Sequence, residues 1–269
     1  MVGVAVGLGN VWRFPYMMGS YGGSAFLFVY LLFVVLLAVP ALTAEWTLGR
    51  YTRAGPMQAF PRIYGRRLGG AIGYLLLITV LVADSYYLVV IGQIVIGGGH
   101  GALAGFSETA LQTFPRHVSN AGLQYAVSII LLALSLWIIG RGLNRGIERV
   151  SRLFVPFFGI VVVYLIATAL TLDGALDRLS AFLRPDFAAL GPKDVFAALG
   201  QAFFSLGLGG TFFVIYGSYL SDDEPLFGSA LATGAGDAGA ALLAGLFVVP
   251  AALSFGLDLE QGPALIFST

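Results

Sequence analysis

The sequence predicts an all-α polytopic membrane protein, and three observations support this fold class. Of the 269 residues, 58% are hydrophobic and only 10% are charged, with a mean hydropathy of +0.89, which is unlike an ordinary soluble domain. Long gaps between charged residues leave room for the ~20 apolar residues that a spanning helix needs. Glycines and polar residues also interrupt two of these apolar stretches.

Seven membrane-spanning helices are predicted from the gaps between charges. The first ends near residue 20 and begins before residue 1, and the others lie near residues 24–45, 69–97, 122–140, 153–172, 195–219 and 230–256. Gly22 and Gly23 separate the first two spans, and residues 50–67 separate the next two. Residues 172–194 are predicted to form a longer, proline-containing loop.

The distribution of basic residues predicts the orientation of these helices. Nine of the 14 Lys and Arg residues follow the second and fourth spans: Arg50, Arg53, Arg62, Arg66, Arg67, Arg141, Arg145, Arg149 and Arg152. Because cytoplasmic loops carry an excess of Lys and Arg, both loops and the N-terminus are predicted to be cytoplasmic. We therefore expect a multi-pass protein of the cell (inner) membrane, with the C-terminal segment outside.

Composition argues against several other classes of protein. The chain has no cysteine, so a disulfide framework or a cysteine metal site cannot be argued, and its net charge of zero does not favour a nucleic-acid partner. A channel would show rings of charge or a repeated carbonyl filter. An intramembrane enzyme would need a catalytic constellation, whereas His100 and His117 fall in a predicted loop. We expect neither an enzyme nor an organic cofactor.

The first interrupted stretch runs from Ala5 to Tyr16 and reads Ala-Val-Gly-Leu-Gly-Asn-Val-Trp-Arg-Phe-Pro-Tyr. It places two glycines, the Asn10 amide and the Arg13 charge inside a lipid-like sequence. Irregular backbone and charge at membrane depth are tolerated only where they line a cavity or are buried in protein. This stretch is therefore interpreted as half of a binding site within the membrane.

A second interrupted stretch, Phe203–Thr211, contains Gly207, Gly209 and Gly210 and repeats the Gly-Leu-Gly of residues 7–9. Paired interruptions in two halves of a chain indicate a transporter site, although small residues also let membrane helices pack closely. With Asn10, Arg13 and the Phe203–Phe204 pair nearby, the split-helix interpretation is favoured. We predict that residues 7–10 and 206–210 are non-helical and adjoin at mid-membrane.

An unwound helix exposes groups that suit specific ligands. Amides at the start of a half-helix carry partial positive charge and suit a carboxylate. Freed carbonyls at the end of a half-helix suit Na⁺, which prefers oxygen ligands, and the side chains of Asn10 and Ser205 add further oxygens.

Four motifs resemble the neurotransmitter:sodium symporter family: residues 7–15 (Gly-Leu-Gly-Asn-Val-Trp-Arg-Phe-Pro), 22–26, 45–50 and 141–148. The resemblance implies an inverted-repeat transporter fold with discontinuous helices 1 and 6. Residues 1–269 would form one transporter domain, incomplete at both ends, with the first five-helix repeat at 1–172 and the start of the second at 195–269. It implies sodium-coupled symport of an amino acid or related small zwitterion by alternating access. The alternative is a transport-incompetent fragment or a non-transporting protein of the same fold.

The same resemblance assigns roles to individual residues. For sodium, it matches one ion site to Ala5, Asn10, Ser205 and Asp237 and a second to Gly3 and Val6. For the substrate, it matches Val4, Ala5, Leu8, Gly9, Tyr87, Phe204 and Ser205, in which the Leu8 and Gly9 amides and the Tyr87 hydroxyl hold the carboxylate. Phe204 would close over the substrate and Arg13 would form one side of an outer gate. Tyr219 is either an inner-gate residue or an interface anchor.

Two acidic residues and three small residues carry further expectations. Asp237 stands where relatives often have asparagine, so its charge implies independence from chloride; it could also simply cap a helix after residues 233–236. Asp84 shares a helix face with Tyr87 and would face a substrate amine, an ion or a neighbouring helix. Gly207, Gly210 and Ala83 leave room for a large apolar or aromatic substrate group, unless the two glycines serve only to unwind the helix.

Overall fold

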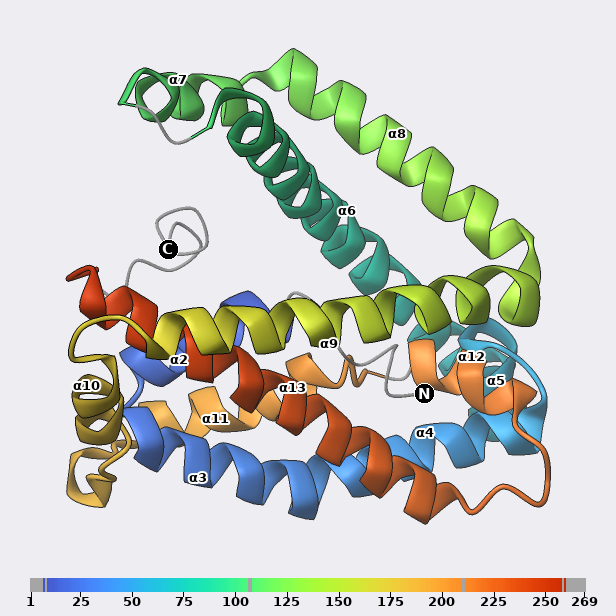
Figure 1. The fold of residues 1–269 in the computed structure, drawn as a ribbon. Coiled ribbons are helices and arrows are strands. Elements are labelled where there is room, and N and C mark those ends of the chain that lie inside the picture. Colours follow the sequence, from blue (N-terminus) through green and yellow to red (C-terminus); the bar gives the residue numbers. More distant parts are fainter. Residues whose placement is uncertain (1–6, 8, 106–107, 210, 258, 260–269) are drawn as a thin grey trace. The chain divides into compact units, whose positions relative to one another are not determined.

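The computed structural model describes residues 7, 9–105, 108–209, 211–257 and 259. In this part of the chain every regular element is a helix (Figure 1), which confirms the predicted all-α class. The chain divides into two compact units. Unit 1 comprises residues 1–76 and 154–269, and unit 2 comprises residues 77–153.

Five helical segments among the described residues are long and apolar enough to cross a membrane: Gly23–Thr52, Arg66–Ala104, Ala121–Gly140, Arg145–Leu170 and Leu226–Ser254. They correspond to the predicted spans at 24–45, 69–97, 122–140, 153–172 and 230–256. The first of them combines α3 (Gly23–Phe33), the π-helix η2 (Val34–Ala38) and α4 (Val39–Thr52). The others correspond to α6 (Arg66–Ala104), α8 (Ala121–Gly140), η3 (Leu143–Ile147) with α9 (Glu148–Leu170), and α13 (Leu226–Ser254).

The two remaining predicted spans are interrupted. One span is split into α11 (Pro192–Ser205) and α12 (Phe212–Tyr219), and residues 206–209 between them are non-helical, as predicted. The other contains a bend at Gly7, then the π-helix η1 (Gly9–Arg13) and α2 (Phe14–Ser20). The prediction that Gly9 and Asn10 are non-helical is wrong. The backbone N–H of Asn10 donates to the Gly7 carbonyl at 3.1 Å, which closes a turn between these two residues. The helical backbone therefore already begins at Gly9.

In unit 1 the two halves of the split helix pack against different parts of one long helix (Figure 1). The first half, α11, contacts α3, whereas the second half, α12, contacts α4. Helix α13 crosses η1, α2 and α4 and completes a core around Phe14, Tyr30, Trp46 and Phe213. In unit 2, α8 is fastened to α6 by a hydrogen bond from Gln124 Nε2 to the Val89 carbonyl at 2.9 Å.

Two sequence-based expectations about loops are wrong. Residues 172–194 include α10 (Ala175–Phe182) and the short 3₁₀ helix η4 (Phe187–Ala189), because Gly174 adopts a φ of +69° and begins a turn that buries Ala175 and Leu179. His100 lies in α6 and His117 in α7 (Glu108–Val118), with ring centroids 4.8 Å apart. Helix α6 continues through Gly97, Gly98 and Gly99, since backbone hydrogen bonding outweighs the low helix propensity of glycine in an apolar segment.

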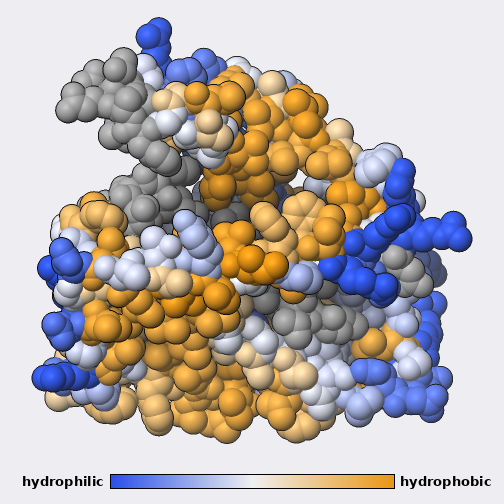
Figure 2. Space-filling model, viewed as in Figure 1, coloured by the Kyte–Doolittle hydropathy of each residue, from blue (hydrophilic) through white to orange (hydrophobic). Residues whose placement is uncertain are grey.

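Large apolar side chains lie on the outer face of these helices. Phe28, Val35 and Leu36 are each more than half exposed on α3 and η2. Figure 2 shows hydrophobic residues covering this flank of unit 1, with hydrophilic residues gathered toward the helix ends. A soluble protein rarely exposes so continuous an apolar surface, so this pattern fits helices that are solvated by lipid.

Candidate functional site

A buried polar cluster joins the two interruptions. The side-chain amide of Asn10, which is 1% exposed, donates to Ser205 Oγ at 3.2 Å, to Asp237 Oδ1 at 2.7 Å and to the Asp237 carbonyl at 3.0 Å. Its Oδ1 atom accepts the Gly7 N–H at 2.8 Å. Three residues predicted to share one sodium site are therefore within hydrogen-bonding distance of one another. They come from η1, α11 and α13.

Asp237 is the charged centre of this cluster and is fully buried. Besides the Asn10 amide, the Tyr30 hydroxyl donates to its Oδ2 atom at 3.5 Å. A buried carboxylate is costly unless it is hydrogen-bonded and paired, and the described contacts are hydrogen bonds from neutral groups. The oxygens of Asp237, Ser205, Asn10 and Tyr30 make a donor set that suits a hard cation such as Na⁺.

The C-terminus of α11 explains how the second interruption forms. The Leu208 N–H donates to the Phe203 carbonyl and the Gly207 N–H to the Phe204 carbonyl, each at 3.0 Å, which is the Schellman hydrogen-bonding pattern. Gly207 has a φ of +66°, which glycine adopts without steric cost. The negative end of the α11 dipole thus lies beside the positive, N-terminal end of η1, where Asn10 meets Ser205.

Aromatic and charged side chains form a second layer around the cluster. The Arg13 guanidinium lies 4.2 Å from the ring centroid of Phe204, and its Nη1 donates to Gln201 Oε1 at 2.6 Å. A Cβ atom on Gly9 would lie 3.3 Å from the Phe204 ring, so the ring packs over the backbone of η1. The predicted gate residues Arg13 and Phe204 are therefore in contact with each other.

A carboxylate from α4 binds the backbone within the second interruption. Glu45 Oε1 accepts the Gly209 N–H at 2.9 Å, and Gly209 has a φ of +157°. Three residues at the site were not predicted from the sequence: Glu45, Tyr30 and Gln201. A usable signal existed for the last two, since each is a polar group in the middle of an apolar span.

An apolar cavity of about 490 Å³ lies beside η1. It is lined by residues of η1, α9 and α13, with Trp12, Leu165, Ala169, Phe247 and Val248 among them. It borders the polar cluster through η1 but contains none of the cluster's side chains, so it is distinct from the site that the sequence predicts.

Several predicted site residues are not tested by these contacts. Gly3, Val4, Ala5, Val6, Leu8 and Gly210 lie outside the described residues. Ala83, Asp84 and Tyr87 belong to α6 in unit 2, and their roles stay predictions. Tyr219 is the last residue of α12 and is 66% exposed, a position open to either of its predicted roles.

Comparison with known proteins identifies relatives along nearly the whole chain. The Sodium:neurotransmitter symporter family model matches residues 1–96 and 102–262. An uncharacterized sodium-dependent transporter of Bacillus subtilis, YhdH, is 34% identical over 99% of this chain and 60% of its own length. One from Haemophilus influenzae is 28% identical over 100% of this chain and 62% of its own length.

A solved structure has the same fold. The crystal structure of MhsT in complex with L-phenylalanine matches with a TM-score of 0.90 and 34% identity, over 99% of this chain and 62% of that chain. The chain thus spans about 60% of the length of these relatives. The split helices, the polar cluster between them and the family match lead to one conclusion: the chain belongs to the sodium:neurotransmitter symporter family.

Proposed function

We propose that the full-length protein is a secondary transporter that couples entry of Na⁺ to uptake of an amino acid or a related small zwitterion. The observation that carries this proposal is the Asn10–Ser205–Asp237 cluster, which places a buried carboxylate between two interrupted helices. No catalytic role is proposed for any of these residues.

Sodium would bind at this cluster as a transported substrate. Ser205 and Asp237 supply oxygens, and the Asp237 carboxylate supplies a full negative charge. In a buried site an unneutralised carboxylate costs several kcal/mol (~3–5), so a cation that pairs with it gains correspondingly. Gly3, Ala5 and Val6 are proposed to add backbone oxygens.

The carboxylate of the substrate would bind at the N-terminal end of η1. The positive end of the helix dipole favours an anion there, and the Leu8 and Gly9 amides with the Tyr87 hydroxyl are proposed to hold it. If this carboxylate also contacts the bound Na⁺, each ligand strengthens binding of the other. This mutual strengthening is sufficient to couple substrate transport to Na⁺ entry.

The substrate side chain is proposed to be large and apolar or aromatic. Gly9 and Gly207 carry no side chain next to Phe204 and Phe212, respectively, and Ala83 is small. MhsT, at 34% identity, is crystallised with L-phenylalanine, which is consistent with such a pocket in this family. Phe204, held against Arg13, would then cover the bound substrate.

We further propose that transport does not need chloride, because Asp237 supplies the negative charge that some relatives take from chloride. We also propose that the protein lies in the inner cell membrane with its N-terminus in the cytoplasm, as the arginine distribution predicts.

Uptake by the full-length protein in proteoliposomes tests the function. An inward Na⁺ gradient should drive accumulation of radiolabelled phenylalanine, leucine or tryptophan, and replacing Na⁺ with K⁺ should abolish it. Equal uptake in Na⁺ and K⁺ would overturn sodium coupling. Uptake of glycine or alanine in strong preference to leucine, tyrosine and tryptophan would overturn the large-substrate proposal and leave symport intact.

A further inference from the structure

Helix α12 packs against α4 with the two backbones in direct contact. A Cβ atom on Gly49 would lie 2.1 Å from the Val214 carbonyl oxygen, and one on Gly217 would lie 2.6 Å from the Trp46 carbonyl oxygen. Small residues permit such close approach between membrane helices. Trp46 also packs edge-to-face on Phe213, with ring centroids 5.9 Å apart. At Gly49 and Gly217, therefore, no side chain separates the backbone of α12 from that of α4.

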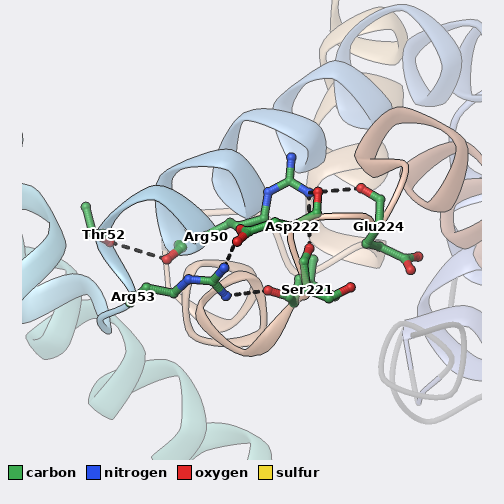
Figure 3. Close-up of polar contacts among 8 residues, drawn as sticks. Arg50, Thr52, Arg53, Ser221, Asp222 and Glu224 are labelled. Atoms are coloured by element: carbon green, nitrogen blue, oxygen red, sulfur yellow. Dashed lines mark hydrogen bonds and ion pairs between the residues drawn. The ribbon is translucent and has the colours of Figure 1, made fainter.

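Arg50, in the last turn of α4, and Arg53, the residue that follows α4, bind the loop after α12 (Figure 3). Arg50 Nη1 donates to the carbonyl oxygens of Ser221 at 3.3 Å, Asp222 at 3.2 Å and Glu224 at 2.9 Å. Arg53 donates to the Leu220 carbonyl and pairs with the Asp222 carboxylate. These contacts span 167–174 positions of sequence. They engage four backbone carbonyls between the end of α12 and the start of α13: those of Leu220, Ser221, Asp222 and Glu224.

The backbone of Arg53 is unusual for its residue type. It ends α4 in the left-handed conformation, with a φ of +50°, and it is the one non-glycine residue with positive φ among the described residues. Glycine occupies such a position at helix ends without steric cost. An arginine in this conformation indicates that its side chain is needed there, and the side chain reaches Leu220 and Asp222.

We propose that Arg50 and Arg53 are positioning residues that fasten α12 to α4, so that the inner half of the broken helix moves together with α4 during transport. This proposal rests on the function proposed above. Glu45 holds Gly209 at the other end of α12, so α4 holds α12 at both ends. The non-helical residues 206–209 then form the joint between α12 and α11, which packs against α3.

The contacts of Arg50 should matter more than those of Arg53. The Arg53–Asp222 pair is exposed, with side chains 45% and 84% accessible, and exposed ion pairs contribute little. Arg50 instead binds three carbonyl oxygens that would otherwise lack a charged donor. Lysine at position 50 keeps the charge but loses the planar guanidinium, so Arg50→Lys should retain only part of the effect.

Transport by the full-length protein gives the first test. The Arg50→Ala/Arg53→Ala variant should lower the maximal uptake rate by about tenfold, the effect of losing charge-assisted hydrogen bonds. The apparent affinities for Na⁺ and substrate should change by less than about threefold, since the site residues are untouched. Arg66→Ala, at an exposed arginine on the same predicted side, is the matched control. Unchanged uptake in the double variant would overturn the proposal.

A covalent replacement of the ion pair separates a positioning role from a general loss of stability. In a background without other cysteines, Arg53→Cys/Asp222→Cys is combined with Arg50→Ala, and a short bifunctional thiol reagent links the two cysteines. If α12 and α4 move as one piece, the link should restore the uptake rate. If they must separate in each cycle, the link should abolish the remaining uptake, and the proposal is wrong.

A distance measurement tests the inference even if the protein transports nothing. Spin labels at Tyr51→Cys on α4 and Ile215→Cys on α12 should give one narrow distance distribution, in Na⁺ and in K⁺. Adding Arg50→Ala/Arg53→Ala should broaden it. A distribution that is broad already in the parent, or equally narrow in the variant, would overturn the fastening role. Absence of Na⁺-dependent uptake with the expected distances would instead contradict the proposed function alone.

Discussion

The interruption after Gly7 and the interruption after Ser205 expose backbone groups in two different ways. At the first, Asn10 binds the Gly7 N–H with its own side chain, so the turn closes within four residues. At the second, a Schellman motif ends α11. Beyond this motif, the backbone N–H of Gly209 donates to Glu45 of α4. The first interruption is held locally and the second depends on α4.

This difference relates each interruption to a separate task. The local closure at Asn10 presents its side-chain amide to Ser205 and Asp237, where ligands are proposed to bind. The remote closure at Gly209 connects the second interruption to α4, which also holds the loop beyond α12 through Arg50. We therefore propose that ligands bind at the first interruption and that the movement which follows binding takes place at the second. Substitutions that remove the Asn10 side chain or the Glu45 side chain separately test whether the two interruptions have these different roles.

The largest effect is expected from Asn10→Ala in the full-length protein. It removes the side-chain amide that donates to Asp237, and loss of one partner of a buried charge costs about 3–5 kcal/mol. Sodium-dependent uptake should fall more than about a hundredfold. Gln58→Ala, at an exposed amide of α5 (Pro56–Tyr64), is the control. Uptake within threefold of the parent would show that the first interruption is not the ion site.

Asp237→Asn should make transport depend on chloride. The substitution keeps the shape of the side chain and removes the charge, so an external anion must replace it. Uptake in gluconate should fall about tenfold, the loss expected for one charge-assisted interaction, and chloride should restore it. The control is Asp223→Asn, at an exposed acid in the loop before α13. Chloride-insensitive uptake at the parental rate would contradict the role of Asp237.

At the second interruption, the two Glu45 substitutions should differ. Glu45→Ala removes the acceptor of the Gly209 N–H, whereas Glu45→Gln keeps a neutral acceptor. A hydrogen bond to a charged group contributes about 1.5–3 kcal/mol, so uptake should fall roughly tenfold in the alanine variant and less in the glutamine variant. Binding of Na⁺ should change little in either. Equal losses in both variants would point to the charge, rather than the hydrogen bond, as the important feature.

How far the sequence predicts this architecture differs between the two interruptions. Asn10 and Ser205 were predictable, because polar side chains in apolar spans are costly and therefore mark sites. Asp237 was assigned to the same site through the resemblance to the symporter family, at a position where relatives often have asparagine. The helical conformation of Gly9 was missed, since two glycines and an asparagine predict irregular backbone, yet the Asn10 side chain closes the turn itself.

The attachment of α12 could not be predicted from local sequence. Glu45, Arg50 and Arg53 are charges near the end of a span, and such residues are usually solvated or lie at the interface. Their partners lie more than 160 positions away along the chain. Only the contact between α4 and α12 brings them together, and that contact depends on Gly49 and Gly217, which carry no chemical signal of their own.

The smallest effect is expected from Tyr30→Phe, which tests the outer edge of the first cluster. The hydroxyl donates to Asp237 Oδ2 across 3.5 Å, at the limit of a hydrogen bond, while the ring packs on Phe14 with centroids 5.2 Å apart. Phenylalanine keeps the packing and removes a weak bond, worth about 0.5–1 kcal/mol. The apparent Na⁺ affinity should therefore weaken about two- to fivefold, with an unchanged maximal uptake rate. A titration of uptake against Na⁺ measures this shift, and Phe26→Leu, at a buried aromatic residue of the same helix, controls for altered packing. A loss as large as that expected for Asn10→Ala would mean that Tyr30 binds the ion directly, and the ion site would then include a residue of α3.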